Sequence, residues 1–523
     1  MTEYSSSSVA VVAALLAVCL AAAWNRRKPK AYPPGPRPFP LPIPFLGRFP
    51  SVALPTSLPW LVYTEWGKRF GPLIHFEAFN QHVLIVNSLE VAHDLFEKRP
   101  HIYSSRPWMP ILELSGFEGA FSGKPYGDQW RMHRRLFDKH FRRESSRSYR
   151  PVQVQKIHDF LRKLNENPQD FSAHVRALPG SVIMSVVYGY NVADYSQDRF
   201  IEIAEEYNLR LTNSFIPGAM PLLDFFPAVR HLPKWFPGCG FHRVAQELLA
   251  LKEEVVHKPF GYAVDNKDSG RSDPVPVVVK MVEEAETSDD EEFDMMKEVT
   301  AASDTTVSAI MTFFLVMALY PAVQRKAQME IDSLLGLSEP GSAIPTFEQK
   351  GSLPYIEAIF REVLRWRPIL PLSLPHATST EDAYNGYYIP KGATAILNVW
   401  PMTREESTYG TNTEDFNPDR FLDVDGTLLE VNHSPLSFGL GPRICPGRFF
   451  AEDTFWMTIV SVLALFNVSN ATTTNPQGLE VEVDAKNPPY SDNPISHPLP
   501  FNCSILPRST AALDLLKGIS RQE

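Results

Sequence analysis

A chain of 523 residues with 44% hydrophobic and 21% charged residues has the composition of a folded globular protein, which excludes a largely disordered one. Its net charge of −10 argues against nucleic acid as the main partner, because phosphate binding requires a basic surface. The cysteines Cys19, Cys239, Cys445 and Cys503 lie far apart without a CxxC pair, which is typical of a protein in a reducing compartment.

The N-terminus contains an uncharged apolar run over residues 9–24, followed by Arg26, Arg27 and Lys28. A cleaved signal peptide is the alternative, but such peptides carry their basic residues before the apolar run. Basic residues after the run hold that side in the cytoplasm. We therefore expect residues 1–8 in the lumen, one transmembrane signal anchor over residues 9–24, and the rest of the chain in the cytosol.

Residues 25–50 are basic and rich in proline, including the stretch Tyr32-Pro33-Pro34-Gly35-Pro36. Proline-rich segments are stiff and extended. This segment is expected to be a linker, and residues 51–523 are expected to form the catalytic body.

The body is predicted to be mainly α with small β-sheets. Residues 82–86 and 393–398 are typical of short strands, and Tyr384-Asn385-Gly386-Tyr387 of a hairpin turn. Residues 299–320 carry Asp304 as their single charge, and they predict a long buried helix or, alternatively, a second membrane span. Further helices are expected from Pro321 up to Gly336 and after Pro354.

Residues 438–448, FGLGPRICPGR, combine a cysteine with several glycines and a neighbouring cation, and a helix follows them. Glycine lets a backbone approach a flat ligand closely. A helix N-terminus and the charge of Arg443 both favour a thiolate at Cys445.

This loop resembles the haem-binding loop of the cytochromes P450 at Phe438, Gly441, Arg443, Cys445 and Gly447. The resemblance implies the cytochrome P450 fold, with Cys445 as the axial thiolate ligand of a haem b iron. The sulfur ligand would donate electron density that favours O–O cleavage.

The resemblance extends to other segments of the chain. Glu362 and Arg365 resemble the ExxR helix of the family, and Arg420 stands in a PxRF segment, so these three residues would form a buried structural triad. The resemblance also implies that Trp130 and Arg134 of a WxxxR helix hold one haem propionate.

The resemblance likewise implies that His376 meets the other propionate, with a turn histidine bonded to backbone as the alternative. Arg443 would add a further cation beside the propionates.

Residues 301–306 resemble the oxygen-activation motif of the family. Asp304 and Thr305 would organise water and deliver protons during the activation of O2. Ala302 departs from the family pattern, which usually has glycine there, and alanine leaves helical geometry less readily.

The implied function is a monooxygenase that uses O2 and acts on an apolar small molecule, most simply a terpenoid-like secondary metabolite. Apolar segments at residues 108–121, 209–226 and 498–501 lie where the family builds its substrate pocket. Two alternatives are a haem-thiolate isomerase or dehydratase that works without O2, and a non-enzymatic haem-binding protein. Proline-rich and YYIPKG segments resemble fungal members.

The electrons are expected from a partner protein, because the chain has no plausible GxGxxG segment after a strand. The resemblance implies NADPH-cytochrome P450 reductase as that partner, and the endoplasmic reticulum membrane as the location. The basic stretch over residues 131–143 is the expected docking face, and residues 233–241, with Trp235 and Phe236, are expected to touch the membrane.

Overall fold

A computed structural model describes residues 30–37, 54–78, 81–192, 198–214, 220, 222–223, 226–268, 274–284, 304–430, 436–475 and 478–519. The predicted signal anchor and Ala302 lie outside these residues. Among the described residues no single helix is long and apolar enough to cross a membrane, and one pair, Thr305–Leu319 with Pro321–Leu335, passes that test only with a bend of 103° between its halves.

Helices dominate the structure, as predicted. The longer ones are α2 (Pro59–Phe70), α6 (Asp128–Phe141), α8 (Arg150–Glu166), α9 (Phe171–Tyr188), α10 (Arg199–Ser214), α12 (Phe241–Asp265), α13 (Val277–Glu284), α15 (Asp304–Leu319), α16 (Pro321–Leu335), α17 (Pro354–Trp366), α20 (Arg448–Leu465) and α21 (Thr510–Ile519). The short ones are α3 (Leu89–Ala92), α4 (Pro100–Tyr103), α5 (Pro110–Leu114), α7 (Arg143–Arg147), α18 (Val399–Met402) and α19 (Glu406–Tyr409), with the π-turn η1 (His93–Glu97) and the 3-10 turns η2 (Phe117–Gly119), η3 (Pro168–Asp170), η5 (Pro227–His231), η6 (Phe347–Ser352), η7 (Pro418–Phe421), η8 (Leu436–Phe438) and η9 (Gly441–Arg443).

Three small sheets accompany the helices. The first sheet has the strand order β1 (Leu73–Ala78), β2 (Gln81–Val86), β6 (Thr394–Leu397), β3 (His376–Ala377). The second sheet pairs β4 (Asp382–Tyr384) with β5 (Tyr387–Ile389). The third sheet has the strand order β8 (Glu480–Glu482), β7 (Phe466–Thr474), β9 (Asn502–Pro507). The two predicted strands are therefore β2 and β6, and they pair in parallel with Ile85 opposite Ile396. The predicted hairpin turn joins β4 and β5, with Asn385 and Gly386 at positive φ as a tight turn of this kind requires.

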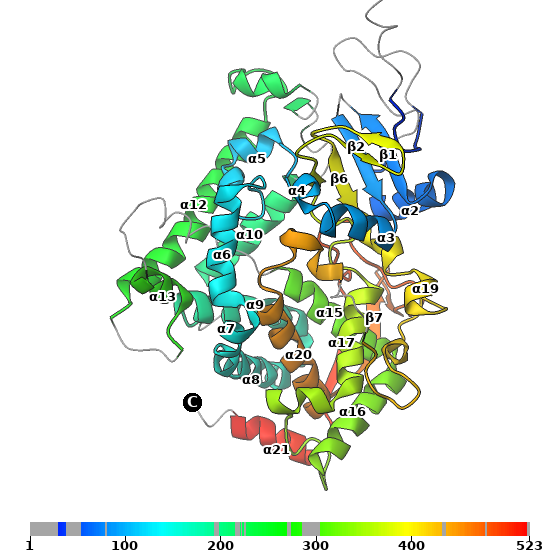
Figure 1. Cartoon of the computed structure of the whole chain (residues 1–523). Coiled ribbons are helices and arrows are strands. Elements are labelled where there is room, and N and C mark those ends of the chain that lie inside the picture. Colours follow the sequence, from blue (N-terminus) through cyan, green and yellow to red (C-terminus); the bar gives the residue numbers. More distant parts are fainter. Residues whose placement is uncertain are drawn as a thin grey trace, which may run out of the picture.

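The main core lies where α15, α17 and α20 meet, in the lower half of Figure 1. Phe313 and Phe314 of α15 and Trp456 of α20 are completely buried there. The described part of the apolar run that contains Asp304 is thus a core helix, in agreement with the first of the two interpretations. Pro321 begins α16, and Gly336 ends it in the left-handed conformation that glycine adopts readily.

The first sheet lies at the upper right of Figure 1, apart from the helical core. The loop before α20 contacts η1, which follows β2 and α3 in the chain. The cysteine loop therefore lies between the sheet-containing lobe and the helical core.

Candidate functional site

The cysteine loop is folded tightly around Cys445. The Cys445 amide donates a hydrogen bond to the Phe438 carbonyl at 2.8 Å, which closes the loop ahead of α20. Gly441 has φ +63°, and a Cβ atom there would lie 2.3 Å from the carbonyl oxygen of Phe96. Only glycine fits at this position, since no side chain tolerates such an approach. Gly447 directly precedes α20, as the helix prediction requires.

The charge environment of the sulfur differs from the prediction in one respect. Burial raises the pKa of the Cys445 thiol, whereas the Gly447 amide and the charges of Arg134 and Arg448 lower it. Arg443 instead donates to the carbonyls of Ser104 at 2.8 Å and Lys124 at 2.6 Å. The cations that favour the thiolate are therefore Arg134 and Arg448, because the Arg443 guanidinium is turned toward the loop before α6.

Trp130 and Arg443 lie against each other. The Arg443 guanidinium carbon is 4.5 Å from the centre of the Trp130 ring. The Trp130 ring is buried, and its Nε1–H has no acceptor among the described residues. Burial, followed by the charge of Arg106, lowers the pKa of Arg443 to about 8. A buried donor without an acceptor among the described residues, beside a half-buried cation, is suited to bind an anion.

Arg106 belongs to the same group, although no sequence motif indicated it. It donates to the carbonyl of Ser122 at 2.8 Å and to that of Pro375 at 2.7 Å, and burial lowers its pKa to about 10. Within the described part of the chain no carboxylate pairs with Arg106 or Arg443. The only local signal was an arginine just ahead of the apolar segment that begins at Trp108.

His376 shows the bond to backbone of the alternative interpretation, and its contact with a propionate stays a prediction. Its Nδ1 lies 2.7 Å from the Tyr103 carbonyl, so the bond to backbone is present. Its ring meets Phe96 edge to face at 4.9 Å. Burial, followed by the charge of Arg106, holds the pKa of His376 well below its usual value, so the imidazole is neutral and its Nε2 remains for a further partner.

These residues fit the carboxylates of a haem. Arg106, Arg443 and His376 are close enough to affect one another's protonation, and Arg443 stacks on the indole whose N–H has no acceptor. Guanidinium and indole N–H donors suit a carboxylate geometrically. When bound, the haem would be held by this group through its propionates and by Cys445 through its iron.

Arg134 has a different environment from the one predicted. It pairs with Asp138 at 2.9 Å and donates to the carbonyl of Ile444, the residue before Cys445. Arg134 thus ties α6 to the cysteine loop. Its predicted contact with a haem propionate stays a prediction.

Of the predicted acid–alcohol pair, the structure describes the backbone of Asp304 and the whole of Thr305. Asp304 is the first described residue of α15. Thr305 is exposed, whereas Ala309, Ile310 and Phe313 farther along the helix are buried. The Thr305 hydroxyl therefore lies at the open end of a helix that is otherwise enclosed in the core.

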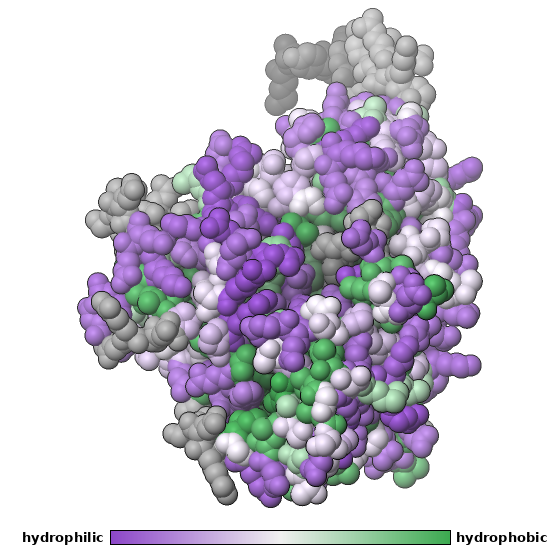
Figure 2. All heavy atoms as spheres, turned by 60° about the horizontal axis from the view of Figure 1, so that its bottom comes forward, coloured by the Kyte–Doolittle hydropathy of each residue, from purple (hydrophilic) through white to green (hydrophobic). Residues whose placement is uncertain are grey.

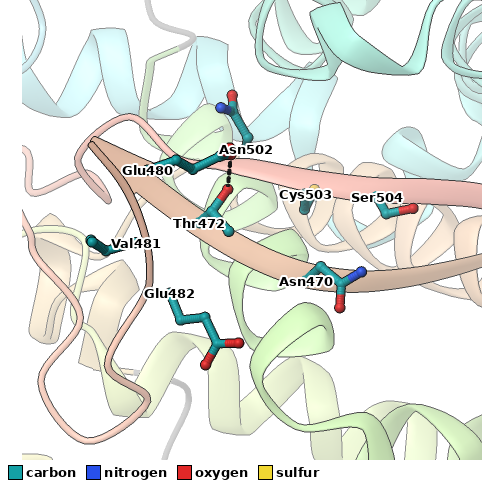
Figure 3. A pocket seen from close by; sticks show the side chains of 8 residues that line it. All are labelled: Asn470, Thr472, Glu480, Val481, Glu482, Asn502, Cys503 and Ser504. Atoms are coloured by element: carbon teal, nitrogen blue, oxygen red, sulfur yellow. Dashed lines mark hydrogen bonds between the residues drawn. The ribbon is translucent and has the colours of Figure 1, made fainter. Parts of the chain in front are cut away.

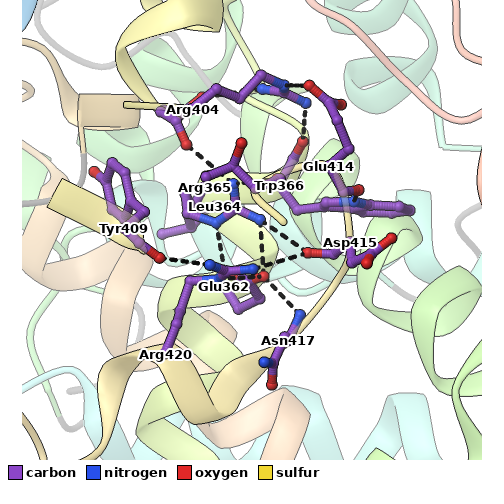
Figure 4. A network of polar contacts seen from close by, with 12 residues as sticks. Glu362, Leu364, Arg365, Trp366, Arg404, Tyr409, Glu414, Asp415, Asn417 and Arg420 are labelled. Carbon is purple, nitrogen blue, oxygen red and sulfur yellow. Dashed lines mark hydrogen bonds and ion pairs between the residues drawn. The ribbon is translucent and has the colours of Figure 1, made fainter. Parts of the chain in front are cut away.

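The predicted triad is present and buried (Figure 4). Arg365 Nε and Nη2 donate to the Glu362 carboxylate at 2.6 Å and 2.8 Å, and Arg420 Nε donates to the same carboxylate at 3.1 Å. The remaining donors of Arg365 bind the carbonyls of Thr403 and Thr413. The network connects α17 to the segment between α18 and η7, and it holds structure in place rather than taking part in chemistry.

Comparison with known proteins identifies the family of this chain. The profile of the family described as cytochrome P450 matches residues 36–490. This chain belongs to the cytochrome P450 family. It is 34% identical to cytochrome P450 monooxygenase COX1 of Coprinopsis cinerea over 99% of this chain and all of that protein. It is also 36% identical to cytochrome P450 monooxygenase ple1 of Rhodocybe pseudopiperita, over 94% of this chain and 93% of that protein.

A third relative, cytochrome P450 monooxygenase 98 of Postia placenta, is 34% identical over 97% of this chain and 96% of that protein. All three relatives are fungal. This P450 is accordingly a haem-thiolate oxidoreductase that incorporates oxygen from O2. The predicted family and enzyme class are confirmed.

Proposed function

We propose that this P450 inserts one oxygen atom from O2 into an apolar, terpenoid-like small molecule of fungal secondary metabolism. The observation that carries the proposal is the anion-deficient group of Trp130, Arg106 and Arg443 beside the cysteine loop. When bound there, haem b supplies the means of activating O2. The chain would hold it through Cys445 and this group, while Thr305 and Asp304 hold water for proton delivery.

An apolar substrate is supported by the segments where the family builds its pocket. Ile111 and Leu112 of α5 pack with Tyr207 and Leu211 of α10 and with residues of α12 in one hydrophobic cluster. Apolar side chains gathered where the family builds its pocket favour an apolar ligand. The test is turnover of a panel of terpenoid and steroid ligands by the membrane fraction, with and without NADPH, O2 and a reductase.

Product that forms only with all three components supports the monooxygenase. Rearranged product in the absence of O2 would indicate an isomerase or dehydratase. Ligand binding without any product would indicate a non-enzymatic haem protein. Either of these outcomes would contradict the proposal.

NADPH-cytochrome P450 reductase is the proposed electron donor, and we propose that it docks on the cysteine side. A groove of about 800 Å³ lies there, and Ile444, Arg448 and Phe449 from the cysteine loop and the start of α20 line part of it. Two guanidinium groups lie over the Phe449 ring, with Arg143 at 4.5 Å and Arg448 at 4.2 Å from its centre. Hydrophilic side chains cover most of the face in Figure 2, and hydrophobic patches are exposed among them.

The individual ion pairs decide which cations of the basic stretch are available for docking. Lys139 pairs with Glu284 at 2.7 Å, and Arg131 pairs with Asp128 at 2.6 Å. Arg135 and Arg143 are exposed, and among the described residues neither has a carboxylate partner. Complementary charge mainly accelerates encounter, and does so most at low salt.

Arg135→Glu with Arg143→Glu should therefore slow reductase-driven turnover severalfold and leave peroxide-driven turnover nearly unchanged. Arg325→Glu, at an exposed position on α16, is the matched control. Equal loss in both assays would mean that Arg135 and Arg143 support the fold instead of docking.

We further propose that the protein is a single-pass protein of the endoplasmic reticulum membrane with its N-terminus in the lumen. Trp235 is 80% exposed and Phe236 is 42% exposed in the loop before α12, which supports a second contact with the membrane. The orientation can be tested with the acceptor sequons at Asn432, Asn467, Asn470 and Asn502, of which the first lies outside the described residues.

Asn467, Asn470 and Asn502 are exposed on β7 and β9, and Figure 3 shows the last two beside a shallow groove of the third sheet. They would be modified readily if the body faced the lumen. Absence of glycan in the native host supports a cytosolic body, and glycan on any of them would contradict it.

A further inference from the structure

Residues 30–37, which lie within the predicted linker, are attached to the body. Pro33 and Pro36 are buried, although proline-rich segments usually remain solvated. The Tyr388 amide donates to the Ala31 carbonyl at 2.7 Å, and the His75 amide donates to the Pro34 carbonyl at 3.0 Å. The segment is therefore bonded to β5 on one side and to β1 on the other.

An aromatic stack reinforces these two bonds. The Tyr32 ring lies parallel to the His75 ring, with 4.5 Å between the centroids and an angle of 8° between the planes. The His82 ring is 5.4 Å from Tyr32. The Lys30 ammonium lies 3.6 Å from the centre of the Tyr388 ring, which closes the stack at its N-terminal end.

Gly35 makes the close approach possible. A Cβ atom at this position would lie 1.9 Å from the carbonyl oxygen of His75. The obstacle is backbone, so a rotamer change cannot remove it. Alanine at this position would push the segment off β1.

The two histidines under Tyr32 are bonded to each other. His75 Nε2 and His82 Nδ1 are 2.9 Å apart, so one ring nitrogen must donate and the other must accept. Burial, followed by the charge of His82, lowers the pKa of His75 to about 4. Burial also lowers the pKa of His82, which faces the carboxylate of Glu77 and the ammonium of Lys30.

We infer that residues 30–37 form a latch, in which Tyr32 stacked on the hydrogen-bonded His75–His82 pair fixes the N-terminal segment to the first sheet and releases it when both imidazoles are protonated. Two imidazolium rings cannot share the hydrogen bond, and they would repel each other and the nearby Lys30. The Glu381 carboxylate, which accepts from the Tyr388 hydroxyl at 2.9 Å, is a further charge on this face. The inference concerns the arm alone and is independent of the proposed function.

Hydrogen exchange of the His75 and Tyr388 amides in the full-length haem-loaded protein tests the latch, because both amides donate to the arm. Tyr32→Ala and Gly35→Ala should each reduce the protection of both amides by roughly tenfold or more, the loss expected when a contact of about 1.4 kcal/mol is removed. Tyr32→Phe, which retains the stack, should leave the protection unchanged. The amides of α20 report whether the fold is intact, and Tyr32→Leu replaces Tyr32→Ala if α20 loses protection.

The pH dependence supplies the second part of the test. After correction for the intrinsic exchange rate, protection of the two amides should fall as the pH is lowered from 6.5 toward 4, and His82→Gln should reduce that dependence. Wild-type protection in Tyr32→Ala and Gly35→Ala would overturn the latch. Protection that is constant over this pH range would overturn the role of the histidine pair.

Discussion

The Arg443 guanidinium lies over the Trp130 ring at 4.5 Å, and the indole N–H at the edge of that ring has no acceptor among the described residues. The two side chains come from the cysteine loop and from α6, so their contact joins these two segments. The carbonyls of Ser104 and Lys124 hold Arg443 in this position.

Trp130→Phe keeps the stacked ring and removes only the N–H donor. A hydrogen bond to a charged acceptor contributes about 1.5–3 kcal/mol, so haem loss should accelerate by roughly 10- to 100-fold. Transfer of haem to an excess of apomyoglobin measures this rate. Trp456→Phe is the matched control, because its Nε1 is also buried without a partner but lies in the core on α20. Equal acceleration in both variants would contradict the role of Trp130.

Cys445→Ala should abolish the thiolate-type absorption band of the reduced carbon-monoxide complex, because the loop places this sulfur directly before α20. Cys239→Ala and Cys503→Ala should retain the band. Cys503 lies on β9 and Cys239 is buried in a hydrophobic cluster, so neither stands in the loop that resembles the haem-binding loop. A band that survives in Cys445→Ala but disappears with either of the others would show that the ligand is misassigned.

Thr305→Ala should retain haem but divert reducing equivalents from product to hydrogen peroxide, because the exposed hydroxyl at the start of α15 is lost. The ratio of product to NADPH consumed measures the coupling. Thr306→Ala removes the neighbouring hydroxyl of the same helix and serves as the matched control. Full coupling in Thr305→Ala, or the same loss in both variants, would contradict the specific role of Thr305.

Glu362→Gln should lower the free energy of unfolding by about 3–5 kcal/mol, because it leaves Arg365 and Arg420 buried without their shared carboxylate. Denaturant unfolding and haem content measure the effect. Glu414→Gln breaks the ion pair between the exposed Glu414 carboxylate and Arg404. It should lower the free energy of unfolding by less than about 1 kcal/mol. A comparable loss of unfolding free energy in the two variants would mean that burial does not determine how much the triad contributes to stability.

A chain that begins at Lys30 should fold and bind haem, because it retains the whole segment that bonds to β1 and β5. A chain that begins at Pro38 should also bind haem but lose protection at the His75 and Tyr388 amides. Haem content and hydrogen exchange check the two expectations. Failure of the longer of these chains to fold would show that residues 1–29 do more than anchor the protein.

The features that could be predicted from the sequence have local signals. Pro321 and Gly336 mark the ends of α16, and Asn385 and Gly386 define a hairpin turn from neighbouring residues alone. Glu362 and Arg365 lie one helical turn apart in the sequence. Their spacing matches the ExxR helix of the family, and this match identified the pair. The assignment of Arg420 as their partner rested on the resemblance, and the structure confirms it.

The features that the sequence did not reveal depend on contacts between distant segments. Arg106 acquires its role only because Pro375 and Ser122 are folded around it. The Arg443 side chain is oriented by its hydrogen bonds to the carbonyls of Ser104 and Lys124, which lie more than 300 residues away in the chain. The stack of Tyr32 on His75 joins a proline-rich arm to a strand, and neither composition nor periodicity carries that information.

The approach of Gly441 to the Phe96 carbonyl also bears on the order of folding. The residues are 345 positions apart, and the space between them is too small for a methyl group. Contacts between such distant segments form slowly, because a long loop must close before they contribute. The cysteine loop can therefore take its final shape only after the sheet-containing lobe has joined the helical core. The chain should capture its cofactor late in folding, and a ribosome-bound chain that ends before α20 should have none.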